Sequence, residues 1–312
     1  MKVLVTGANG FVGNALVPYL LERGVDVVPV VRRPSGIPHE SVLHIADRDS
    51  WLAALKGCDS VVHLAGRAHV MHEAAADPVQ AFKTANVDNA LTVARYAAAA
   101  GVARLVFLSS VKVNGESTRP GQCFCADDKP APQDDYARSK CEAERGLLDL
   151  ASQTGMEVVV VRPPLVYGPG VKGNFIQLIR WGTGRIPLPL GATDNARSMI
   201  ALDNLLHFVH LCTDRGTSAE AANQVFAVSD GEPVSTTNLL KSVATAYGRG
   251  PWLVPIPGTL VRWLAHFIGK GDSAEKVLGS LVVSDQKART LLGWTPPVTM
   301  HEQLRRMSTT PN

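Results

Sequence analysis

The chain has 312 residues, of which 46% are hydrophobic and 19% are charged, and its formal net charge is +3 at pH 7. These values are ordinary for a globular protein of one large or two modest domains, and the small charge argues against a nucleic-acid partner. No apolar run reaches the ~18 residues that a membrane span needs, so we expect no membrane insertion. The chain starts directly in an apolar run and has an odd number of cysteines, five. Together these features predict a cytoplasmic protein with free thiols.

The first predicted elements form a strand–turn–helix–strand unit. The apolar run 3–5 is short enough for a buried strand, and residues 11–20 repeat apolar side chains at helical spacing. A second apolar run follows at 27–31. Three glycines lie between the first strand and the helix with the spacing G-x-x-G-x-x-G: Gly7, Gly10 and Gly13. The length and order of the unit are typical of a dinucleotide-binding crossover.

Each glycine has a chemical reason in such a unit. Gly7 allows backbone angles that a sharp turn needs, and Gly10 lets a pyrophosphate approach the backbone. Gly13 lets the helix pack close to the strand. The N–H groups of the first helical turn then favour phosphate. The segment therefore predicts a dinucleotide site rather than a merely structural turn.

The end of the second strand bears on the choice of cofactor. NAD-binding units usually place an acidic residue here, which accepts hydrogen bonds from the ribose hydroxyls. In this chain Val31 is followed by Arg32 and Arg33. Because a guanidinium can bind a ribose 2′-phosphate, the pattern favours NADP(H), with NAD(H) possible. The alternative is that both arginines are solvated surface charges.

Further strands and helices alternate along the chain. A strand over 42–45 leads to Asp47, which is placed to contact adenine or to cap the next helix. The other strands are predicted over 60–64, 104–108 and 157–161, and long helices over 77–100 and 135–151. This alternation predicts an α/β fold with a Rossmann-type doubly wound parallel sheet, whose ligands lie outside the carboxyl ends of the strands.

After residue 165 glycine and proline become frequent and the helical patterns become short. We expect a dinucleotide-binding domain over 1–165 and a smaller, mixed C-terminal substrate region over 166–191 and 229–312. Segments near 192–228 are expected to rejoin the first domain, with a helix at 202–211 and a strand at 225–228. We expect the apolar stretch 260–268 to form a packed amphipathic helix rather than a membrane-surface helix.

Two groups of side chains could suggest a metal. Cys123-x-Cys125 resembles half of a metal site, but no second pair of cysteines is near in the sequence. His63, His69 and His72 are close in the sequence, but His63 ends a buried strand, so we do not expect the three to share a metal. We therefore expect no metal site and interpret His63 as a core histidine.

Tyr136 and Lys140 carry the chemistry that the sequence predicts. They are four residues apart and so share one face of a helix. A tyrosine has a pKa of about 10 in water, and a neighbouring ammonium group lowers it by stabilising the phenolate. Tyr136 can then exchange a proton with an alcohol oxygen while a hydride moves at the carbon. Ser110, at the end of the strand 104–108, can bind the same oxygen.

In combination, these motifs resemble those of the extended short-chain dehydrogenases/reductases, in the nucleotide-sugar epimerase/dehydratase branch. The resemblance covers nearly the whole chain. It implies that Ser110, Tyr136 and Lys140 form a catalytic triad. It also implies a homodimer that pairs through the helices starting near Asp77 and Asp135. The cofactor contacts that it implies are Gly7, Gly10, Phe11, Gly13, Arg32, Asp47, Leu64, Ala65, Gly66, Asn86, Ser109, Tyr136, Lys140 and Pro163.

The resemblance further implies a UDP-sugar substrate. Ser110, Asn174 and Arg197 match substrate positions, and the last two would contact its diphosphate or nucleoside. The acidic residue that dehydratases use beside the triad serine is missing, because Val111 and Lys112 follow Ser110. Dehydration is therefore disfavoured.

The leading hypothesis is an NADP(H)-dependent 4-ketoreductase of a UDP-linked 4-keto-6-deoxy-N-acetylhexosamine, in polysaccharide precursor synthesis. The alternative is a UDP-sugar 4-epimerase with tightly bound NAD. A small-carbonyl reductase and a non-catalytic dinucleotide sensor are weaker alternatives, and the intact triad argues against the sensor.

Overall fold

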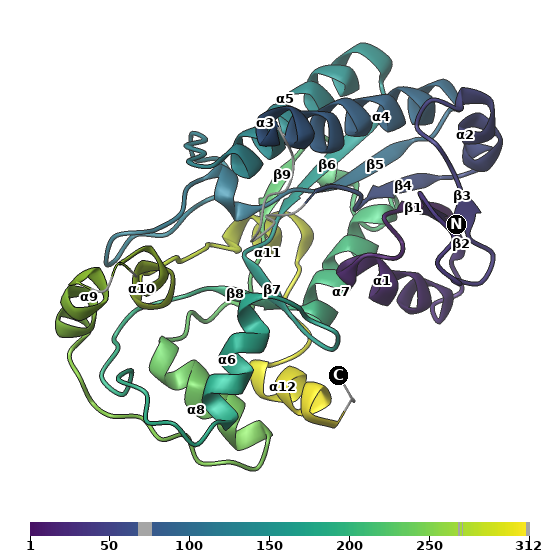
Figure 1. Ribbon diagram of the computed structural model, residues 1–312. Helices are drawn as coiled ribbons and strands as arrows, with labels where there is room; N and C mark the ends of the chain where they lie inside the picture. Colours follow the sequence, from purple (N-terminus) through teal and green to yellow (C-terminus); the bar gives the residue numbers. More distant parts are fainter. Residues whose placement is uncertain (68–76, 268, 270, 310–312) are drawn as a thin grey trace.

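The computed structural model describes residues 1–67, 77–267, 269 and 271–309. It is built around one seven-stranded sheet with the order β3-β2-β1-β4-β5-β6-β9 (Figure 1). Every pairing in this sheet is parallel, which confirms the predicted Rossmann-type doubly wound fold. The strand order reverses at β1, where sheets of this kind bind their ligands. The strands are β1 (Lys2–Thr6), β2 (Asp26–Val31), β3 (Ser41–Val42), β4 (Ser60–His63), β5 (Arg104–Leu108), β6 (Glu157–Arg162) and β9 (Val225–Ala227).

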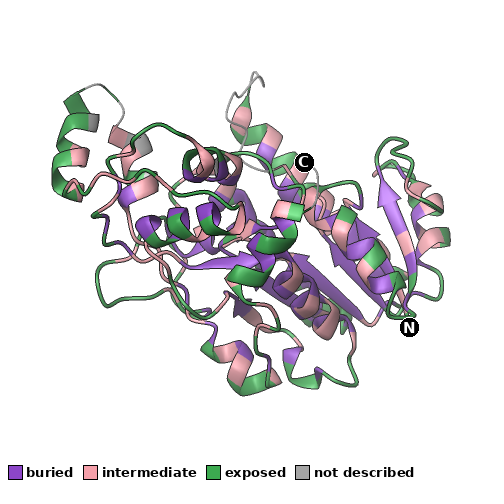
Figure 2. Cartoon of the chain, turned by 90° about the horizontal axis from the view of Figure 1, so that it is seen from below, coloured by how far each residue is buried: buried purple, intermediate pink, exposed green. Residues whose placement is uncertain are grey.

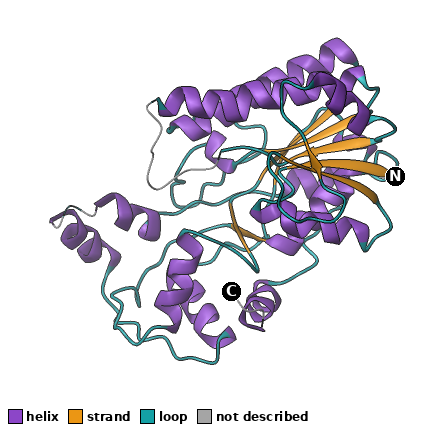
Figure 3. Cartoon of the chain, turned by 45° about the vertical axis from the view of Figure 1, so that its right-hand side comes forward, coloured by secondary structure: helices purple, strands orange, loops and turns teal. Residues whose placement is uncertain are grey.

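Helices cover both faces of the sheet (Figure 3). Alternate residues of β1 show why: Val3 and Val5 belong to one buried cluster and Leu4 to the other. The first face is covered by α1 (Phe11–Leu21), α7 (Leu202–Thr213) and α11 (Gln286–Leu292). The second is covered by α2 (Arg48–Leu55), α4 (Asn89–Ala99) and α5 (Asp135–Thr154). The strands are accordingly buried along most of their length (Figure 2).

Two predicted elements differ from those observed. The expected strand over 42–45 pairs with β2 only at Ser41 and Val42. The expected helix over 77–100 is divided into α3 (Pro78–Phe82), a π-helical turn η1 (Lys83–Asp88) and α4. Asp77 caps its start, accepting a 3.0 Å hydrogen bond from the Gln80 N–H. π-Helical turns shift the register of side chains locally, and this one carries Asn86.

The remaining elements form a second, smaller unit. β7 (Leu165–Tyr167) pairs in parallel with β8 (Met199–Ala201). Around this pair pack α6 (Asn174–Thr183), α8 (Thr236–Ala246) and α12 (Met300–Thr309). In contrast, α7 packs on β4 and β5, and β9 pairs with β6. The chain therefore returns to the large sheet after β8. Two short 3₁₀ turns complete the fold, η2 (Val111–Val113) and η3 (Ala219–Ala221).

The helix α9 (Gly258–Phe267) lies against α10 (Gly271–Leu278) at one end of the molecule (Figure 1). Val261 packs into a small cluster with Leu278. In contrast, Trp263 and Phe267 are 58% and 75% exposed. The expected packed helix therefore packs along only one stripe. Within the described part of the chain, no helix is long and apolar enough to span a membrane.

Candidate active site

The glycine turn after β1 has the tight packing that its spacing predicts. Gly7 has a positive φ of 68°, and a Cβ atom there would lie 2.8 Å from the Ala65 backbone nitrogen. A Cβ atom at Gly13 would lie 2.2 Å from the Gly7 carbonyl oxygen. Side chains at these positions would push apart β1, α1 and the loop after β4. Gly10 is the N-cap of α1 and supplies no side-chain cap to its first turn. These features fit a pyrophosphate at the start of α1.

The structure leaves the cofactor preference open at the end of β2. Arg32 and Arg33 are both exposed just after this strand, where a 2′-phosphate could reach them and where solvated charges would also lie. Asp47 caps α2 and accepts hydrogen bonds from the Ser50 N–H at 3.2 Å and the Ser50 hydroxyl at 2.6 Å. These bonds lower the pKa of Asp47. The capping alternative is therefore observed, and an additional adenine contact stays a prediction.

Ser110 and Tyr136 come together at the carboxyl end of β5. The Ser110 hydroxyl lies near enough to the Tyr136 phenol to lower its pKa. Tyr136 is the second residue of α5, whose N-cap Asp134 accepts a 2.7 Å hydrogen bond from the Ala137 N–H. The Phe82 ring packs edge-on against the Tyr136 ring, with centroids 6.1 Å apart. The two hydroxyls are therefore near each other, and a substrate oxygen bound between them could accept or donate a proton.

Burial raises the pKa of Tyr136, which the Ser110 hydrogen bond and the Lys112 ammonium partly offset. This direction is opposite to the lowered pKa expected from the Tyr–Lys spacing. Lys140 instead donates a 2.8 Å hydrogen bond to the Leu108 carbonyl oxygen. Its ammonium group lies 4.6 Å from the centre of the Phe107 ring, and burial lowers the pKa of Lys140 to about 8.

Asn86 organises the loop that follows β4. Its amide nitrogen donates to the Arg67 carbonyl at 3.1 Å and to the Ser139 hydroxyl at 2.9 Å. Its amide oxygen accepts from the Arg67 N–H at 2.7 Å. A Cβ atom at Gly66 would meet both the Asn86 oxygen, at 2.9 Å, and the Lys140 ammonium, at 3.4 Å. Both N–H groups of the Asn86 amide thus bind protein partners. Asn86 also positions the Gly66 backbone beside Lys140.

The remaining predicted cofactor residues surround this edge of the sheet. Phe11 and Leu64 are partly buried against the cluster below α1. Pro163 is buried after β6, and its carbonyl oxygen accepts a 3.0 Å hydrogen bond from the Val111 N–H. This bond fixes the turn that contains Ser110.

A buried polar network behind the triad is the part of the site that the sequence analysis missed. The Ser109 hydroxyl donates to the Glu144 carboxylate. Arg162 also binds Glu144, at 2.6 Å, and donates at 3.1 Å to the Asn114 side-chain oxygen. The one sequence signal was the position of Glu144, one helical turn after Lys140. Ser109 is therefore turned toward the core, and its hydroxyl supports the end of β5.

The two predicted substrate residues lie in the second unit. Arg197 is partly buried, and its guanidinium donates a 3.0 Å hydrogen bond to the Gly279 carbonyl. Burial lowers its pKa. Asn174 is the first residue of α6, and its side chain is outside what the structure describes. The described contacts therefore do not bring these two residues to the Ser110–Tyr136 pair.

His63 is the buried histidine that the sequence predicted. Its Nδ1 atom lies 3.0 Å from the Thr6 hydroxyl, which also accepts from the Ala65 N–H. Burial and the nearby Lys140 charge lower its pKa to about 3. His69 and His72 fall outside the described residues. Among the side chains that are described, no group of three or more His, Cys, Asp or Glu is arranged to hold a metal.

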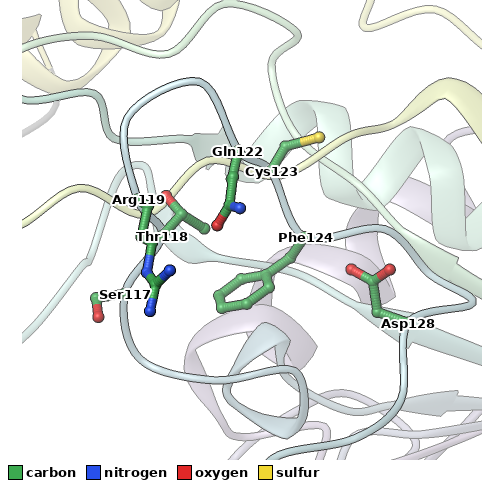
Figure 4. A pocket seen from close by; sticks show the side chains of 7 residues that line it. All are labelled: Ser117, Thr118, Arg119, Gln122, Cys123, Phe124 and Asp128. Carbon is green, nitrogen blue, oxygen red and sulfur yellow. The ribbon is translucent and has the colours of Figure 1, made fainter.

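A separate cavity of about 430 Å³ opens in the loop after η2 (Figure 4). Its wall contains neither Ser110, Tyr136 nor Lys140, so the predicted proton transfer does not take place there. Cys123 and Cys125 are exposed in this loop, and all five cysteines are free. The lining residues are Ser117, Thr118, Arg119, Gln122, Cys123, Phe124 and Asp128.

Comparison with known proteins agrees with this fold. The sequence profile of the NAD dependent epimerase/dehydratase family matches residues 3–223. A UDP-glucose 4-epimerase of Vibrio cholerae is 39% identical over 311 residues, which cover 98% of this chain and 94% of that protein. A 2-alkyl-3-oxoalkanoate reductase of Stenotrophomonas maltophilia (strain K279a) is 30% identical, with 98% of each chain covered. The solved structure of MoeE5 in complex with UDP-glucuronic acid and NAD has a TM-score of 0.72 and 27% identity, with 97% of this chain and 96% of that chain covered.

The chain has the fold of a solved short-chain dehydrogenase/reductase superfamily protein from Agrobacterium tumefaciens, with a TM-score of 0.76 at 21% identity over 99% of this chain and 96% of that chain, and this is the fold class that the sequence predicted. Within this class, the chain belongs to the NAD dependent epimerase/dehydratase family. It is an NAD(P)-dependent enzyme, and the glycine turn fits such a dinucleotide.

Proposed function

We propose that this enzyme transfers a hydride at C4 of a UDP-linked sugar, with Ser110, Tyr136 and Lys140 as its catalytic residues. The observation that carries the proposal is that Ser110, after β5, and Tyr136, in the first turn of α5, lie near each other, with Lys140 one helical turn further along α5 and bound to the Leu108 carbonyl at the end of β5. The relative that is 39% identical is named a UDP-glucose 4-epimerase, and MoeE5 was solved with a UDP-sugar. Both names support a UDP-sugar substrate.

A bound nicotinamide dinucleotide would supply or accept the hydride, and the protein groups would manage the proton. The start of α1 would hold the pyrophosphate through Gly10 and Phe11. Ser110 would bind the C4 oxygen and orient it toward Tyr136, which would transfer the proton. Lys140 would bind the nicotinamide ribose. Its ammonium group is held at the end of β5 by the bond to the Leu108 carbonyl.

We favour net reduction of a 4-keto sugar, a UDP-4-keto-6-deoxy-N-acetylhexosamine, with NADPH. Net reduction needs an exchangeable, reduced cofactor, and the exposed Arg32 and Arg33 suit the 2′-phosphate of NADPH. The second candidate is a 4-epimerase with retained NAD, which the name of the Vibrio cholerae relative favours. In either reaction Tyr136 has the same role.

We further infer that residues 166–191 and 229–312 hold the UDP-sugar, with Asn174 and Arg197 near its diphosphate or nucleoside. We also propose a homodimer that pairs through the outer faces of α4 and α5. Arg197→Ala tests the first inference, because it should raise KM for the UDP-sugar and leave KM for the cofactor unchanged.

The deciding experiment measures cofactor consumption. Purified enzyme is given a UDP-4-keto-6-deoxy sugar with NADPH or NADH, and absorbance at 340 nm is followed. We expect stoichiometric loss of NADPH, with NADH used poorly. In an Arg32→Ala/Arg33→Ala double variant, KM for NADPH should rise about tenfold or more, because paired hydrogen bonds to a phosphate are lost, while NADH use should stay unchanged.

A different result would support the second candidate function, the 4-epimerase. Retained NAD, no net consumption and interconversion of UDP-glucose with UDP-galactose would establish the epimerase. The two arginines would then be surface charges.

A further inference from the structure

Lys112 lies between the two segments that carry the proton-transfer groups. It is in η2, directly after the Ser110 turn, and its own N–H donates a 3.3 Å hydrogen bond to the Ser110 hydroxyl oxygen. Its ammonium group donates at 2.6 Å to the Asp134 carboxylate and at 3.0 Å to the Glu116 carboxylate. Lys112 thus contacts Ser110 through its backbone N–H, and it contacts the loop before α5 through its side-chain ammonium group.

Asp134 connects Lys112 to the start of α5. Its other carboxylate oxygen accepts from the Ala137 N–H and caps α5, and Tyr136 lies in the first turn of that helix. The Lys112 and Asp134 side chains are 33% and 26% exposed, so their ion pair is shielded from much of the solvent. The pair therefore fixes the start of α5 relative to the turn that holds Ser110.

The charges around Tyr136 give Lys112 a second role. Its ammonium lowers the pKa of Tyr136, and the Asp134 carboxylate raises it. Lys140, on the same helix, is bound to the Leu108 carbonyl. On the side of α3, Tyr136 meets the Phe82 ring, over which the Arg67 guanidinium lies. Glu116 is the second carboxylate that binds the Lys112 ammonium group.

We propose that Lys112 is a positioning residue that holds the Ser110 turn against the start of α5 and supplies positive charge to the Tyr136 phenol. This inference rests on the proposed function only in taking Tyr136 as the group that transfers the proton. It gives a chemical role to the position at which Lys112 stands in place of an acidic residue. In an enzyme that only reduces or epimerises, a cation there stabilises the phenolate, whereas a carboxylate would oppose its formation.

The primary test measures ionisation at position 136 without any substrate. 3-Fluorotyrosine is installed at that position, because its phenol ionises at lower pH than tyrosine, and the fluorine NMR shift is followed against pH. Lys112→Met and Lys112→Gln should each raise the midpoint by roughly half a unit to one unit, because a nearby cation is lost. Lys112→Arg should keep the midpoint within about 0.2 units of the parent value, because the positive charge is retained.

The matched control is Lys287→Met. Lys287, in α11, also binds an aspartate at 2.6 Å, Asp127, whose side chain is 74% exposed, and its loss should leave the midpoint unchanged. The proposal is overturned if the Met and Gln variants titrate like the parent protein, or if the Lys287 variant shifts by the same amount. Thermal unfolding of every variant verifies that a shift is not due to loss of structure.

Turnover provides the second readout. With an active substrate, Lys112→Met should lower kcat about three- to tenfold, because proton transfer is impaired, with less than a twofold change in KM. Equal kcat and a raised KM would instead assign Lys112 to substrate binding and overturn the positioning role. If the unsubstituted enzyme turns over none of the UDP-sugars, the proposed function fails, yet the fluorine titration still decides the role of Lys112.

Discussion

The charge of Lys140, on α5, opposes the protonation of His63, at the end of β4. The Lys140 ammonium is one reason that the pKa of His63 falls to about 3, and burial is the larger one. Burial likewise lowers the pKa of Lys140, to about 8. At neutral pH this pair therefore carries one positive charge, on Lys140, and a neutral imidazole that binds Thr6.

The neutral state of His63 predicts an acid-sensitive fold. An unfolded histidine takes up a proton below about pH 6.5, whereas the folded one does so only near pH 3. Between these values the unfolded chain binds more protons, so the stability that His63 contributes is present above pH 6.5 and is lost as pH falls. His63→Asn should make the free energy of urea unfolding depend less on pH between 6.5 and 4.5.

His301 offers the control for this prediction, because it is exposed on α12. His301→Asn should leave the pH dependence of unfolding as it is in the parent protein. An unchanged slope in the His63 variant would mean that other groups cause the acid sensitivity.

At the scale of elements, the Arg162–Glu144 pair connects β6 with α5, and through Ser109 with β5. Both side chains are about 5% exposed or less. Removal of one partner leaves the other charge buried and unpaired, which typically costs about 3–5 kcal/mol. Arg162→Met should therefore lower the free energy of unfolding by about that amount, as measured by urea denaturation.

The chain contains a matched pair for comparison. Arg215 binds Glu157 at the same 2.6 Å but is 54% exposed, and Glu157 keeps its bond to Arg104. Arg215→Met should cost less than about 1 kcal/mol. Similar losses in the two variants would contradict the view that burial makes the Arg162 pair critical.

Elements with a local signal were predicted well from the sequence. The glycine spacing and the apolar runs located β1, α1, β5 and β6 because the pattern of each is contained within a few residues. The break of the helix over 77–100 was missed, since a π-helical turn has no propensity signal of its own. The strand over 42–45 was too long, because partners across the sheet decide how far a strand pairs.

In the site, too, features with a local sequence signal were predicted and features set by tertiary contacts were not. Spacing alone identified Tyr136 and Lys140, but not the direction of the shift in the pKa of Tyr136, which depends on burial. The Lys112–Asp134 contact joins residues 22 positions apart in sequence, and the Glu144 network joins residues 18 to 48 positions apart. Such contacts follow from tertiary packing, and one sequence does not display them.

At the scale of the whole molecule, the large sheet and the helix α9 differ in how fully they bury aromatic side chains. Phe208 of α7 is fully buried against Phe226 and Trp294. Phe267 of α9 is 75% exposed and contacts the Trp263 ring, with centroids 4.9 Å apart. The large sheet therefore has a closed core, whereas α9 presents aromatic surface outward.

This difference predicts opposite sensitivities to truncation. Phe208→Ala should lower the free energy of unfolding by about 3–5 kcal/mol, because it leaves a cavity in the core. Phe267→Ser should change it by less than about 0.5 kcal/mol, because the side chain is mainly in solvent. Urea denaturation of both variants measures the two values, and a large loss at Phe267 would show that α9 has a packing partner in solution.

The return of the chain to the large sheet after β8 has a consequence for synthesis on the ribosome. When residue 165 has been made, β6 has no neighbour on its outer edge, and α7 has not yet covered β4 and β5. The dinucleotide half can close only after β9 and α11 have emerged, more than 120 residues later if counted to Leu292. Until α7 and α11 have been made, only α1 covers this apolar face of the sheet, and β7, α6 and β8 of the smaller unit are made in that interval.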